Sequence, residues 1–338
     1  MMNKIIIGDA IDALKSLPSE SVNVCVTSPP YYGLRNYEAD GQIGLEETPD
    51  EYINKLVEVF REVRRVLRPD GTLWLNIGDS YATGTKAKRK QSSNPGVGAN
   101  NPKAQNSVPK VGTPEGCKTK DLIGIPWMLA FALRADGWYL RQDIIWAKPN
   151  PMPESVKDRC TKSHEHIFLL SKSPKYYFDA EAISEPIAES SAKRYLQDIA
   201  SQAGSHRQPG RGGRSMKAAA PRFGGQKYGD DVRPESRTKS GNLYTPTPRR
   251  NKRDVWTVST KGFKGEHFAV FPEKLVEPCI LAGCPEGGTV LDPFVGSGTS
   301  GVVAKKNGRN FIGIDVNPQY ASMATQRIES VGGAAANG

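Results

Sequence analysis

Cysteine and histidine are scarce in this sequence of 338 residues, which contains five Cys and four His. The number of cysteines is odd, and no two of them form a Cys-x-x-Cys pair. This pattern argues against a disulfide framework and against a structural zinc site. We therefore expect ordinary reduced thiols at Cys25, Cys117, Cys160, Cys279 and Cys284.

Long apolar runs are also absent. No stretch approaches the ~20 apolar residues of a membrane-spanning helix. The N-terminal MMNKIIIGDA lacks the basic region, apolar stretch and cleavage site of a signal peptide. Hydrophobic residues make up 37% of the chain and charged residues 24%, as in a soluble globular protein. We expect a cytoplasmic protein with no membrane partner.

Positive charge is concentrated in two segments. Lys193 to Arg253 holds 15 Lys and Arg against four Asp and Glu, and Lys86 to Lys120 holds eight against one. Because the whole chain carries +10, the remainder is net acidic. Two basic inserts rich in Gly, Pro, Ser and Asn indicate nucleic-acid binding. The alternative is a pair of solvated linkers.

Outside these inserts, strand-like and helix-like segments alternate. We expect strands at residues 5–7, 22–26, 73–77, 139–147, 165–171, 289–291 and 311–314. We expect helices at residues 9–17, 49–67, 122–137, 272–282, 300–307 and 318–328. The alternation predicts an α/β fold with a Rossmann-like, doubly wound and mostly parallel sheet, covered by helices on both faces.

The segment TVLDPFVGSGTSG, residues 289–301, runs from a strand through a glycine-rich turn into a helix. Gly296, Gly298 and Gly301 satisfy G-x-G-x-x-G, and Asp315 ends the next strand, where dinucleotide-binding folds place an acidic residue on a ribose. Glycines let a ligand approach the backbone, and a carboxylate accepts hydrogen bonds from ribose hydroxyls. The pattern predicts a site for an adenosine-containing cofactor. The alternative is a tight turn in an unliganded domain.

The position of this loop constrains the order of the sheet. Only residues 300–338 follow it, too few for the remaining strands of a nucleotide-binding sheet. Those strands must come from the N-terminal half, so the cofactor half of the domain is encoded last.

A second unusual segment, TSPPYYGLRNY at residues 27–37, follows the apolar run VNVCV. Proline continues neither a sheet ladder nor a helix, so Pro29 and Pro30 predict a stiff turn directly after a buried strand. Aromatic residues follow at once. A turn this rigid and aromatic either does more than reverse the chain or is an unusually costly loop.

The chain resembles the S-adenosylmethionine-dependent DNA amino-methyltransferases of the β class, in which the catalytic tetrapeptide precedes the cofactor loop. The similarity rests on TSPPY, DPFVGSGT and GID, and extends to GDAIDAL, VLRPDGTLWLNIGD, WAKPNPMPESVKDRCTKSHEHIFLLSK and HFAVFPEKL. It covers nearly all of the chain except the basic inserts. It implies a class I methyltransferase fold, S-adenosyl-L-methionine as cofactor, double-stranded DNA as partner, and a prokaryotic or phage origin. In a restriction-modification system, a cognate restriction endonuclease would be a further partner.

The resemblance places the catalytic residues at Ser28, Pro29, Pro30 and Tyr31. An exocyclic amine is a poor nucleophile because its lone pair is delocalised into the ring. Acceptors against its N–H bonds would free the lone pair for in-line attack on the sulfonium methyl. The rigid turn can hold the Pro29 carbonyl as one acceptor, and Ser28 can supply the second. Tyr31 offers a face for the base, which must leave the duplex stack.

The resemblance also implies the cofactor-binding residues: Asp9, Asp292, Phe294, Gly296, Ser297, Gly298, Thr299 and Asp315. In this set Asp315 is the ribose carboxylate and Asp9 lies beside the adenine. For Asp9 the alternative is a helix N-cap. Phe268 and Phe271 are candidates for the adenine pocket or, alternatively, core residues.

Serine at the first position of the tetrapeptide resembles the cytosine-N4 enzymes more than the adenine-N6 enzymes, which mostly carry Asp. We therefore expect cytosine N4 methylation, with adenine N6 as the alternative. A nicotinamide-dependent oxidoreductase would leave SPPY and the basic inserts unexplained. A non-catalytic DNA-binding relative would need neither SPPY nor the cofactor loop, and an RNA or protein-glutamine methyltransferase fits the second insert less well.

No metal is expected. His164 and His166 alternate along a strand and share one face without a third ligand, and methyl transfer from a sulfonium needs no metal. We expect Glu165 to orient a loop. Arg35 and Lys148 are either phosphate contacts or surface charges.

The expected domain organisation is discontinuous. Residues 1–85 form the methyl-transfer half of the catalytic domain, 86–120 a basic mobile insert, 121–185 a continuation of the catalytic domain, 186–254 the basic target-recognition region, 255–330 the cofactor-binding half and 331–338 a flexible tail.

Overall fold

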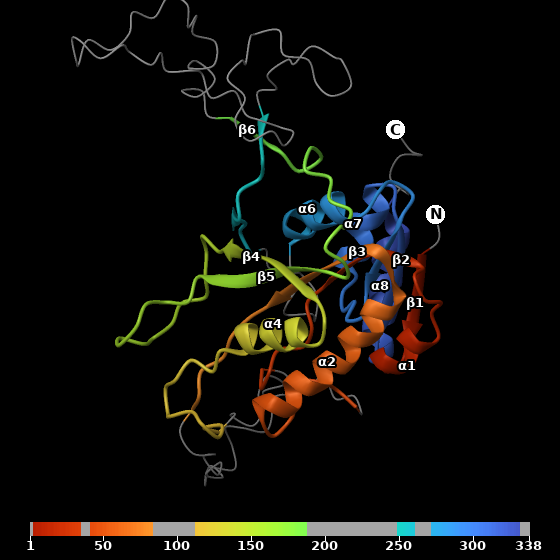
Figure 1. Ribbon diagram of the computed structural model, residues 1–338. Helices are drawn as coiled ribbons and strands as arrows, with labels where there is room; N and C mark the ends of the chain where they lie inside the picture. The colour runs from red at the N-terminus through yellow and green to blue at the C-terminus, as the bar shows by residue number, and fades with distance from the viewer. Residues whose placement is uncertain (1–2, 35–40, 84–111, 188–248, 261–271, 332–338) are drawn as a thin grey trace, which may run out of the picture. The chain divides into compact units, whose positions relative to one another are not determined.

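Figure 1 shows a computed structural model of the protein, which describes residues 3–34, 41–83, 112–187, 249–260 and 272–331. The chain divides into two compact units, one of residues 1–182 and 253–338 and the other of residues 183–252. In the second unit the described residues form a short antiparallel pair, β6 (Glu185–Pro186) and β7 (Arg249–Arg250). The first unit contains a single large sheet.

The sheet has eight strands in the order β1-β10-β9-β2-β3-β5-β4-β8. Strand β5 runs antiparallel to its two neighbours, and all other adjacent strands run parallel. The strands are β1 (Asn3–Ile7), β2 (Val22–Thr27), β3 (Leu67–Ile77), β4 (Tyr139–Ala147), β5 (His164–Ser171), β8 (Val255–Thr257), β9 (Thr289–Asp292) and β10 (Asn310–Asp315). This confirms the predicted Rossmann-like, mostly parallel sheet.

The two ends of the chain build one half of this sheet. The N-terminal β1 pairs with the C-terminal β10, and Figure 1 shows the red N-terminal strand beside the blue C-terminal elements. Strand β2 in turn pairs with β9. The cofactor half, encoded last, is therefore completed by strands encoded first, as the position of the glycine loop predicted.

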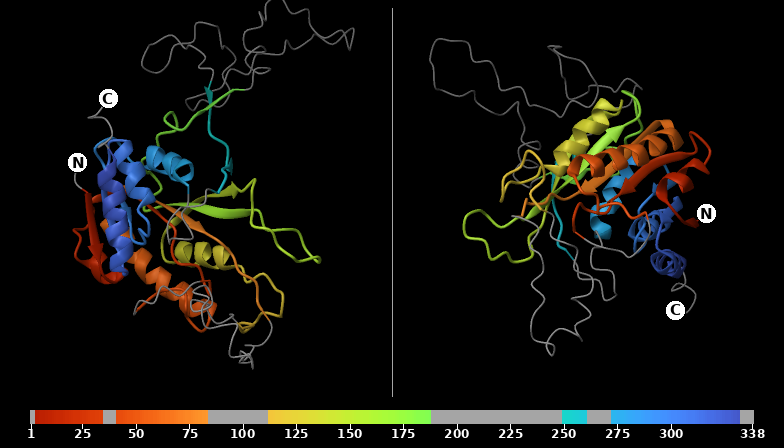
Figure 2. Two further views of the ribbon diagram at one scale, coloured as in Figure 1. Left: turned by 180° about the vertical axis from the view of Figure 1, so that it is seen from behind. Right: turned by 90° about the horizontal axis from the view of Figure 1, so that it is seen from below.

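Helices cover both faces of the sheet. On one face α1 (Ala10–Lys15), α2 (Pro49–Val66) and α4 (Ile125–Ala135) pack in sequence against one another, as the view from below in Figure 2 shows. On the other face α6 (Glu273–Gly283), α7 (Thr299–Lys306) and α8 (Pro318–Ser330) do the same. Within the described residues, no helix is long and apolar enough to cross a membrane. All five cysteines are free thiols.

Helix α2 illustrates how local sequence fixes an element. Thr48 caps its N-terminus by accepting a hydrogen bond from the Glu51 amide at 3.2 Å, and Pro49 occupies the first turn. Acidic residues lie in the first turn and arginines in the last, which suits the helix dipole. An apolar stripe of the helix is buried in the core cluster that also contains residues of β2 and β3: Tyr52, Leu56, Phe60 and Val63.

Two element boundaries differ from the sequence expectation by more than two residues. Helix α4 begins at Ile125 rather than at 122, because Gly124 adopts a left-handed conformation (φ 87°) that starts the helix. Strand β3 begins at Leu67 rather than at 73, with a register shift between the pairs Val22–Leu67 and Val24–Thr72. The Pro69-Asp70-Gly71 segment thus interrupts the regular pairing without ending the strand. Strands β6, β7 and β8 were not expected.

Candidate active site

The carboxyl ends of β1, β10, β9, β2 and β3 meet at one edge of the sheet, because these strands run parallel. Strand β2 ends at Thr27, directly before the Ser-Pro-Pro-Tyr turn, and β9 ends at Asp292, directly before the glycine loop. The Thr27 hydroxyl donates to Asp292 Oδ1 at 2.6 Å. One hydrogen bond therefore joins the starting points of the two predicted functional segments.

Asp292 also organises the glycine loop. Its second oxygen accepts from the Ser300 hydroxyl at 2.5 Å, and Oδ1 accepts from the Phe294 amide at 3.1 Å. The side chain is buried, and this burial raises the pKa of Asp292 to about 6, although its three hydrogen bonds act in the opposite direction. Asp292 was predicted as a cofactor-binding residue, and its visible interactions hold the loop to β2 and to α7.

The loop itself uses glycine where other residues would be strained or would clash. Gly296 and Gly298 have φ values of 49° and 82°, and Gly298 directly precedes α7. A Cβ on Gly301 would lie 2.3 Å from Ile328 Cδ1, so this glycine lets α7 pack closely on α8. Ser297 is buried, and its carbonyl accepts a hydrogen bond from Arg327.

Asp315, at the end of β10, faces the glycine loop. Its Oδ2 accepts from the Gly296 amide at 2.9 Å and its Oδ1 from the Asn317 amide at 2.8 Å. Burial raises the pKa of Asp315, while the two backbone hydrogen bonds lower it. Each carboxylate oxygen accepts about two hydrogen bonds, so Asp315 keeps acceptor capacity for ribose hydroxyls.

The Thr299 hydroxyl provides a second sign of a ligand site. Its Oγ1 is buried and has no hydrogen-bond partner among the residues that the structure describes, an arrangement that native structures rarely leave uncompensated. Together with the free acceptor capacity of Asp315 and the left-handed glycines, this orphaned group fits a polar, adenosine-containing cofactor.

Asp9 follows β1 at the same edge, where the Gly8 amide donates to the Asp315 carbonyl at 3.0 Å. The Asp9 carboxylate caps α1 by accepting from the amides of Ile11 at 2.9 Å and Asp12 at 3.2 Å. The N-cap alternative is thus observed, and a contact to adenine stays a prediction. Phe268, Phe271 and Arg35 lie outside the described residues.

The Ser-Pro-Pro-Tyr turn is held from two sides. The Tyr52 hydroxyl of α2 donates to the Pro30 carbonyl at 2.8 Å, which fixes the turn to the helix layer. Ser28 is half-buried and Pro29 is buried. Tyr31 rests on Gly78, where an added Cβ would lie only 2.6 Å from Tyr31 Cε2. The turn and its aromatic ring are therefore held in place by α2 and by the end of β3.

The Tyr31 hydroxyl reaches a polar cluster on β3 and β5. It donates to Glu165 Oε2 at 2.7 Å and lies 3.2 Å from Asn76 Oδ1. Burial and the Glu165 carboxylate raise the pKa of Tyr31 well above its usual value, while the Ser28 side chain opposes this shift. Glu165 also pairs with Lys148. Lys148, which the sequence left as either a phosphate contact or a surface charge, is thus part of this cluster.

Sequence reasoning missed Asn76 and Gly78 altogether. The available signal was the polar and glycine residues at the end of the apolar run LWLNIGD, which is where parallel strands deliver functional groups.

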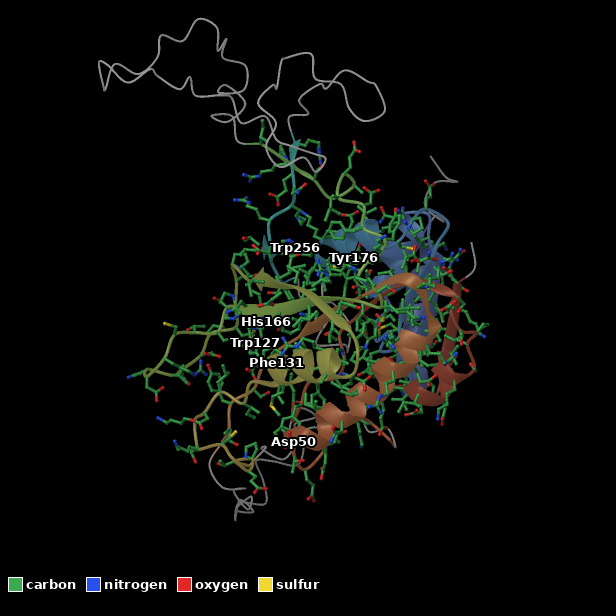
Figure 3. The ribbon with its side chains drawn as sticks, viewed as in Figure 1. Asp50, Trp127, Phe131, His166, Tyr176 and Trp256 are labelled. Carbon is green, nitrogen blue, oxygen red and sulfur yellow. The ribbon has the colours of Figure 1, made fainter. Side chains whose placement is uncertain are left out.

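The two histidines of β5 have other partners. His166 Nδ1 lies 3.0 Å from Asp143 Oδ1, and the ring of His164 is 5.4 Å from that of His166, as expected for residues on one face. Trp127 of α4 packs 5.0 Å from the His166 ring, and both are labelled near Phe131 in Figure 3. In the described part of the chain, no group of three or more His, Cys, Asp or Glu is arranged to hold a metal.

Comparison with known protein families identifies the family of this chain. The family model described as DNA methylase, which covers the N6 and N4 amino-methyltransferases, matches residues 22–326. The chain belongs to this DNA methylase family.

Curated relatives of the methylase are similar along almost the whole chain. Type II methyltransferase M.SmaI of Serratia marcescens is 46% identical over 326 residues, covering 96% of this chain and 90% of the relative. Type II methyltransferase M.Cfr9I of Citrobacter freundii is 45% identical over 322 residues, covering 95% and 86%.

Solved structures share the fold of the methylase. The PvuII DNA methyltransferase (cytosine-N4-specific) aligns with a TM-score of 0.59 and 18% identity, over 97% of this chain and 86% of the other. A DNA modification methylase from Thermus thermophilus, solved in complex with S-adenosyl-L-methionine, aligns with a TM-score of 0.55 and 20% identity, over 96% and 93%. The sheet is therefore that of the class I methyltransferases.

Family membership confirms the predicted activity and cofactor. The methylase transfers a methyl group from S-adenosyl-L-methionine to the exocyclic amine of a DNA base. The alternatives of a nicotinamide-dependent oxidoreductase and of a non-catalytic relative are wrong.

Proposed function

We propose that the methylase acts on N4 of a cytosine flipped out of double-stranded DNA, with Ser28, Pro29, Pro30 and Tyr31 forming the reaction site. The observation that carries this proposal is the hydrogen bond of 2.6 Å between Thr27 and Asp292. It brings the carboxyl end of β2, from which the tetrapeptide starts, against the start of the glycine loop. The turn that binds the methyl acceptor and the loop that binds the methyl donor thus start from two residues that are hydrogen-bonded to each other.

In this mechanism the protein supplies positioning and hydrogen-bond acceptors. When bound, S-adenosyl-L-methionine supplies an electrophilic methyl group on a sulfonium. Tyr52 occupies the Pro30 carbonyl, and we assign the Pro29 carbonyl as one acceptor for the amine and Ser28 Oγ as the other. Acceptors fixed before the reaction cost no ordering during it. The Tyr31 ring stacks on the extruded base.

We assign a role toward the cofactor to each of the predicted cofactor-binding residues. Asp315 accepts hydrogen bonds from the ribose, and Thr299 Oγ1 gains a partner that it lacks in the described part of the chain. The cofactor approaches the backbone of the glycine loop along Phe294, Gly296, Ser297 and Gly298. Asp9 lies at the adenine end of the cofactor. Asp292 acts on the cofactor through the shape of the loop.

The preference for cytosine rests on Ser28. A neutral hydroxyl is a weaker acceptor than the carboxylate that most adenine-N6 enzymes of this class carry at this position. Adenine N6 is the second candidate. The named activity of the PvuII enzyme, cytosine-N4-specific, agrees with the first.

We further propose that residues 186–254 form the target-recognition region and that residues 86–120 contact DNA. The separation of residues 183–252 as a compact unit and the 15 Lys and Arg between 193 and 253 support this assignment. Because its relatives are named type II methyltransferases, we propose a cognate restriction endonuclease as its partner and the cytoplasm of a prokaryotic cell as its place of action.

The test of base identity is direct. Purified protein is incubated with labelled S-adenosyl-L-methionine and unmethylated genomic DNA, and the product is digested to nucleosides and separated by mass spectrometry. We expect label in N4-methylcytosine. Label in N6-methyladenine would overturn the assignment of the base but not the assignment of the reaction site.

The test of the site uses Ser28→Ala and Tyr31→Ala. Loss of an acceptor or of the stacking face should lower methyl transfer at least tenfold, a typical magnitude for a positioned catalytic group. Affinity for S-adenosyl-L-methionine, measured by calorimetry, should stay unchanged. Wild-type turnover by Tyr31→Ala would contradict the assignment of the site.

A further inference from the structure

The Ser-Pro-Pro-Tyr turn does not by itself fix the direction of the Tyr31 ring. Proline rigidity determines the backbone before Tyr31, but the direction of the ring depends on side-chain torsions. Gly78 limits the ring on one side, because there is no room for even a Cβ between the two residues. The remaining rotation is controlled at the hydroxyl end.

The hydroxyl end is anchored to Glu165. The Tyr31 hydroxyl donates to Glu165 Oε2 at 2.7 Å, which is a short and charge-assisted hydrogen bond. Asn76 Nδ2 donates to the same oxygen at 3.2 Å and to the His166 carbonyl at 3.2 Å. The acceptor that receives Tyr31 is therefore itself held by β3.

The other oxygen of Glu165 is held by Lys148. This ion pair is largely shielded, with 13% of the Glu165 side chain and 17% of the Lys148 side chain exposed. The Lys148 ammonium also lies 4.3 Å from the centre of the Trp146 ring, which fixes its position on β4. Four side chains, three from β3, β4 and β5 and one from the residue directly after β4, thus fix one phenol: Asn76, Trp146, Glu165 and Lys148.

We propose that Glu165 is a positioning residue for methyl transfer, which sets the orientation of the Tyr31 ring against the target base through the Tyr31 hydroxyl. This inference rests on the proposed stacking role of Tyr31. Glu165 acts through Tyr31, Lys148 acts through Glu165, and Asn76 contacts both Glu165 and the Tyr31 hydroxyl. A ring fixed in one orientation presents its face to the base without a loss of side-chain entropy at that step.

The protonation state of Tyr31 agrees with this arrangement. Burial and the neighbouring carboxylate raise the pKa of Tyr31, so the hydroxyl remains a donor over the physiological range.

The experiment is a double-mutant cycle with Tyr31→Phe and Glu165→Ala. Tyr31→Phe keeps the stacking face and removes only the anchored hydroxyl. Single-turnover methyl transfer is measured with saturating DNA and S-adenosyl-L-methionine, together with the cofactor Kd and the melting temperature. We expect each single variant to lose about tenfold in rate, the effect of one hydrogen bond to a charged group, and the double variant to lose no more than the worse single variant. Cofactor Kd should not change.

Two further variants separate positioning from a structural effect. Glu165→Gln keeps an acceptor oxygen for Tyr31 and should retain most of the rate. If the alanine variant does not fold, Glu165→Met, which removes the acceptor and keeps the length of the side chain, replaces it in the cycle. Glu154→Ala is the matched control, because Glu154 is also a half-buried glutamate paired with a basic residue, Arg159, in the segment between β4 and β5. Its rate should equal that of the wild type.

The outcomes are distinguishable. If the losses from Tyr31→Phe and Glu165→Ala multiply in the double variant, or if Glu165→Ala retains full rate, the positioning role is overturned, and the proposed reaction site still stands. Wild-type turnover by Tyr31→Ala would instead contradict the proposal of the reaction site itself.

Discussion

Two aspartates at the ends of neighbouring strands have different roles, although sequence reasoning assigned both to the cofactor. Asp292 is buried, and its carboxylate accepts hydrogen bonds from Thr27, Phe294 and Ser300. Asp315 accepts one backbone amide at each oxygen and keeps further acceptor capacity. The first shapes the loop, and the second has acceptor capacity for the ribose that we propose it binds.

This difference predicts that Asp315→Ala weakens binding of S-adenosyl-L-methionine by about tenfold or more, the magnitude of hydrogen bonds to a charged acceptor. Isothermal calorimetry on the purified variant measures the affinity. Asp50→Ala, an exposed residue in the first turn of α2 (Figure 3), is the control and should bind like the wild type. Unchanged affinity in Asp315→Ala would contradict the role of Asp315 as ribose ligand.

For Asp292 the prediction concerns pH. Its pKa is raised to about 6 in the folded state, above the ordinary value of about 3.9 in an unfolded chain. The folded state thus holds this proton more tightly, so the stabilisation is complete below pH ~4 and is lost as pH rises through 6. Relative to Asp292→Asn, the free energy of unfolding of the wild type should fall by about 2 kcal/mol between pH 4 and pH 7. Urea unfolding at several pH values measures this difference, and parallel pH profiles would refute it.

At the scale of elements, the site depends on close packing at the ends of strands and helices. Gly78, directly after β3, supports the Tyr31 ring. Gly301 lets α7 approach Ile328 and Phe311. Each glycine occupies a place where a methyl group has no room, but the neighbours that would move are different.

Gly78→Ala and Gly301→Ala should therefore fail in different ways. In Gly78→Ala the new Cβ would displace the Tyr31 ring, so methyl transfer should fall at least tenfold, as for loss of a positioned group, with cofactor affinity retained. In Gly301→Ala the helices α7 and α8 must separate, so the melting temperature and cofactor affinity should fall together. Calorimetry and a transfer assay on both variants check this. The same pattern in both would contradict the distinction.

At the scale of the whole molecule, the charge is divided between an acidic body and two basic segments, most of which lie outside the described residues. If residues 186–254 contact phosphates, DNA affinity must depend on salt.

Replacement of Arg211 and Arg214 by Gln should lower the slope of log K against log salt by about two, one for each phosphate contact. Fluorescence anisotropy with a duplex at several salt concentrations measures the slope. The control replaces Lys15 and Lys274, two exposed lysines of the first unit, and should keep the wild-type slope. An unchanged slope in the arginine variant would argue for a linker.

The sequence by itself determined the class of fold, the order of its two halves and the family. These depend on local signals: alternating apolar runs, glycines before a helix, prolines after a strand, and the capping of α2 by Thr48. Such signals act within a few residues, so they can be read along the chain.

Tertiary structure alone decided which side chains meet. Tyr31 and Glu165 are 134 positions apart, and Thr27 and Asp292 are 265 apart. Their contacts depend on the strand order that places β9 beside β2 and β5 beside β3. The sequence showed that Asp292 and Glu165 are acidic, but only burial and hydrogen-bond partners distinguish a carboxylate that holds a loop from one that holds a phenol.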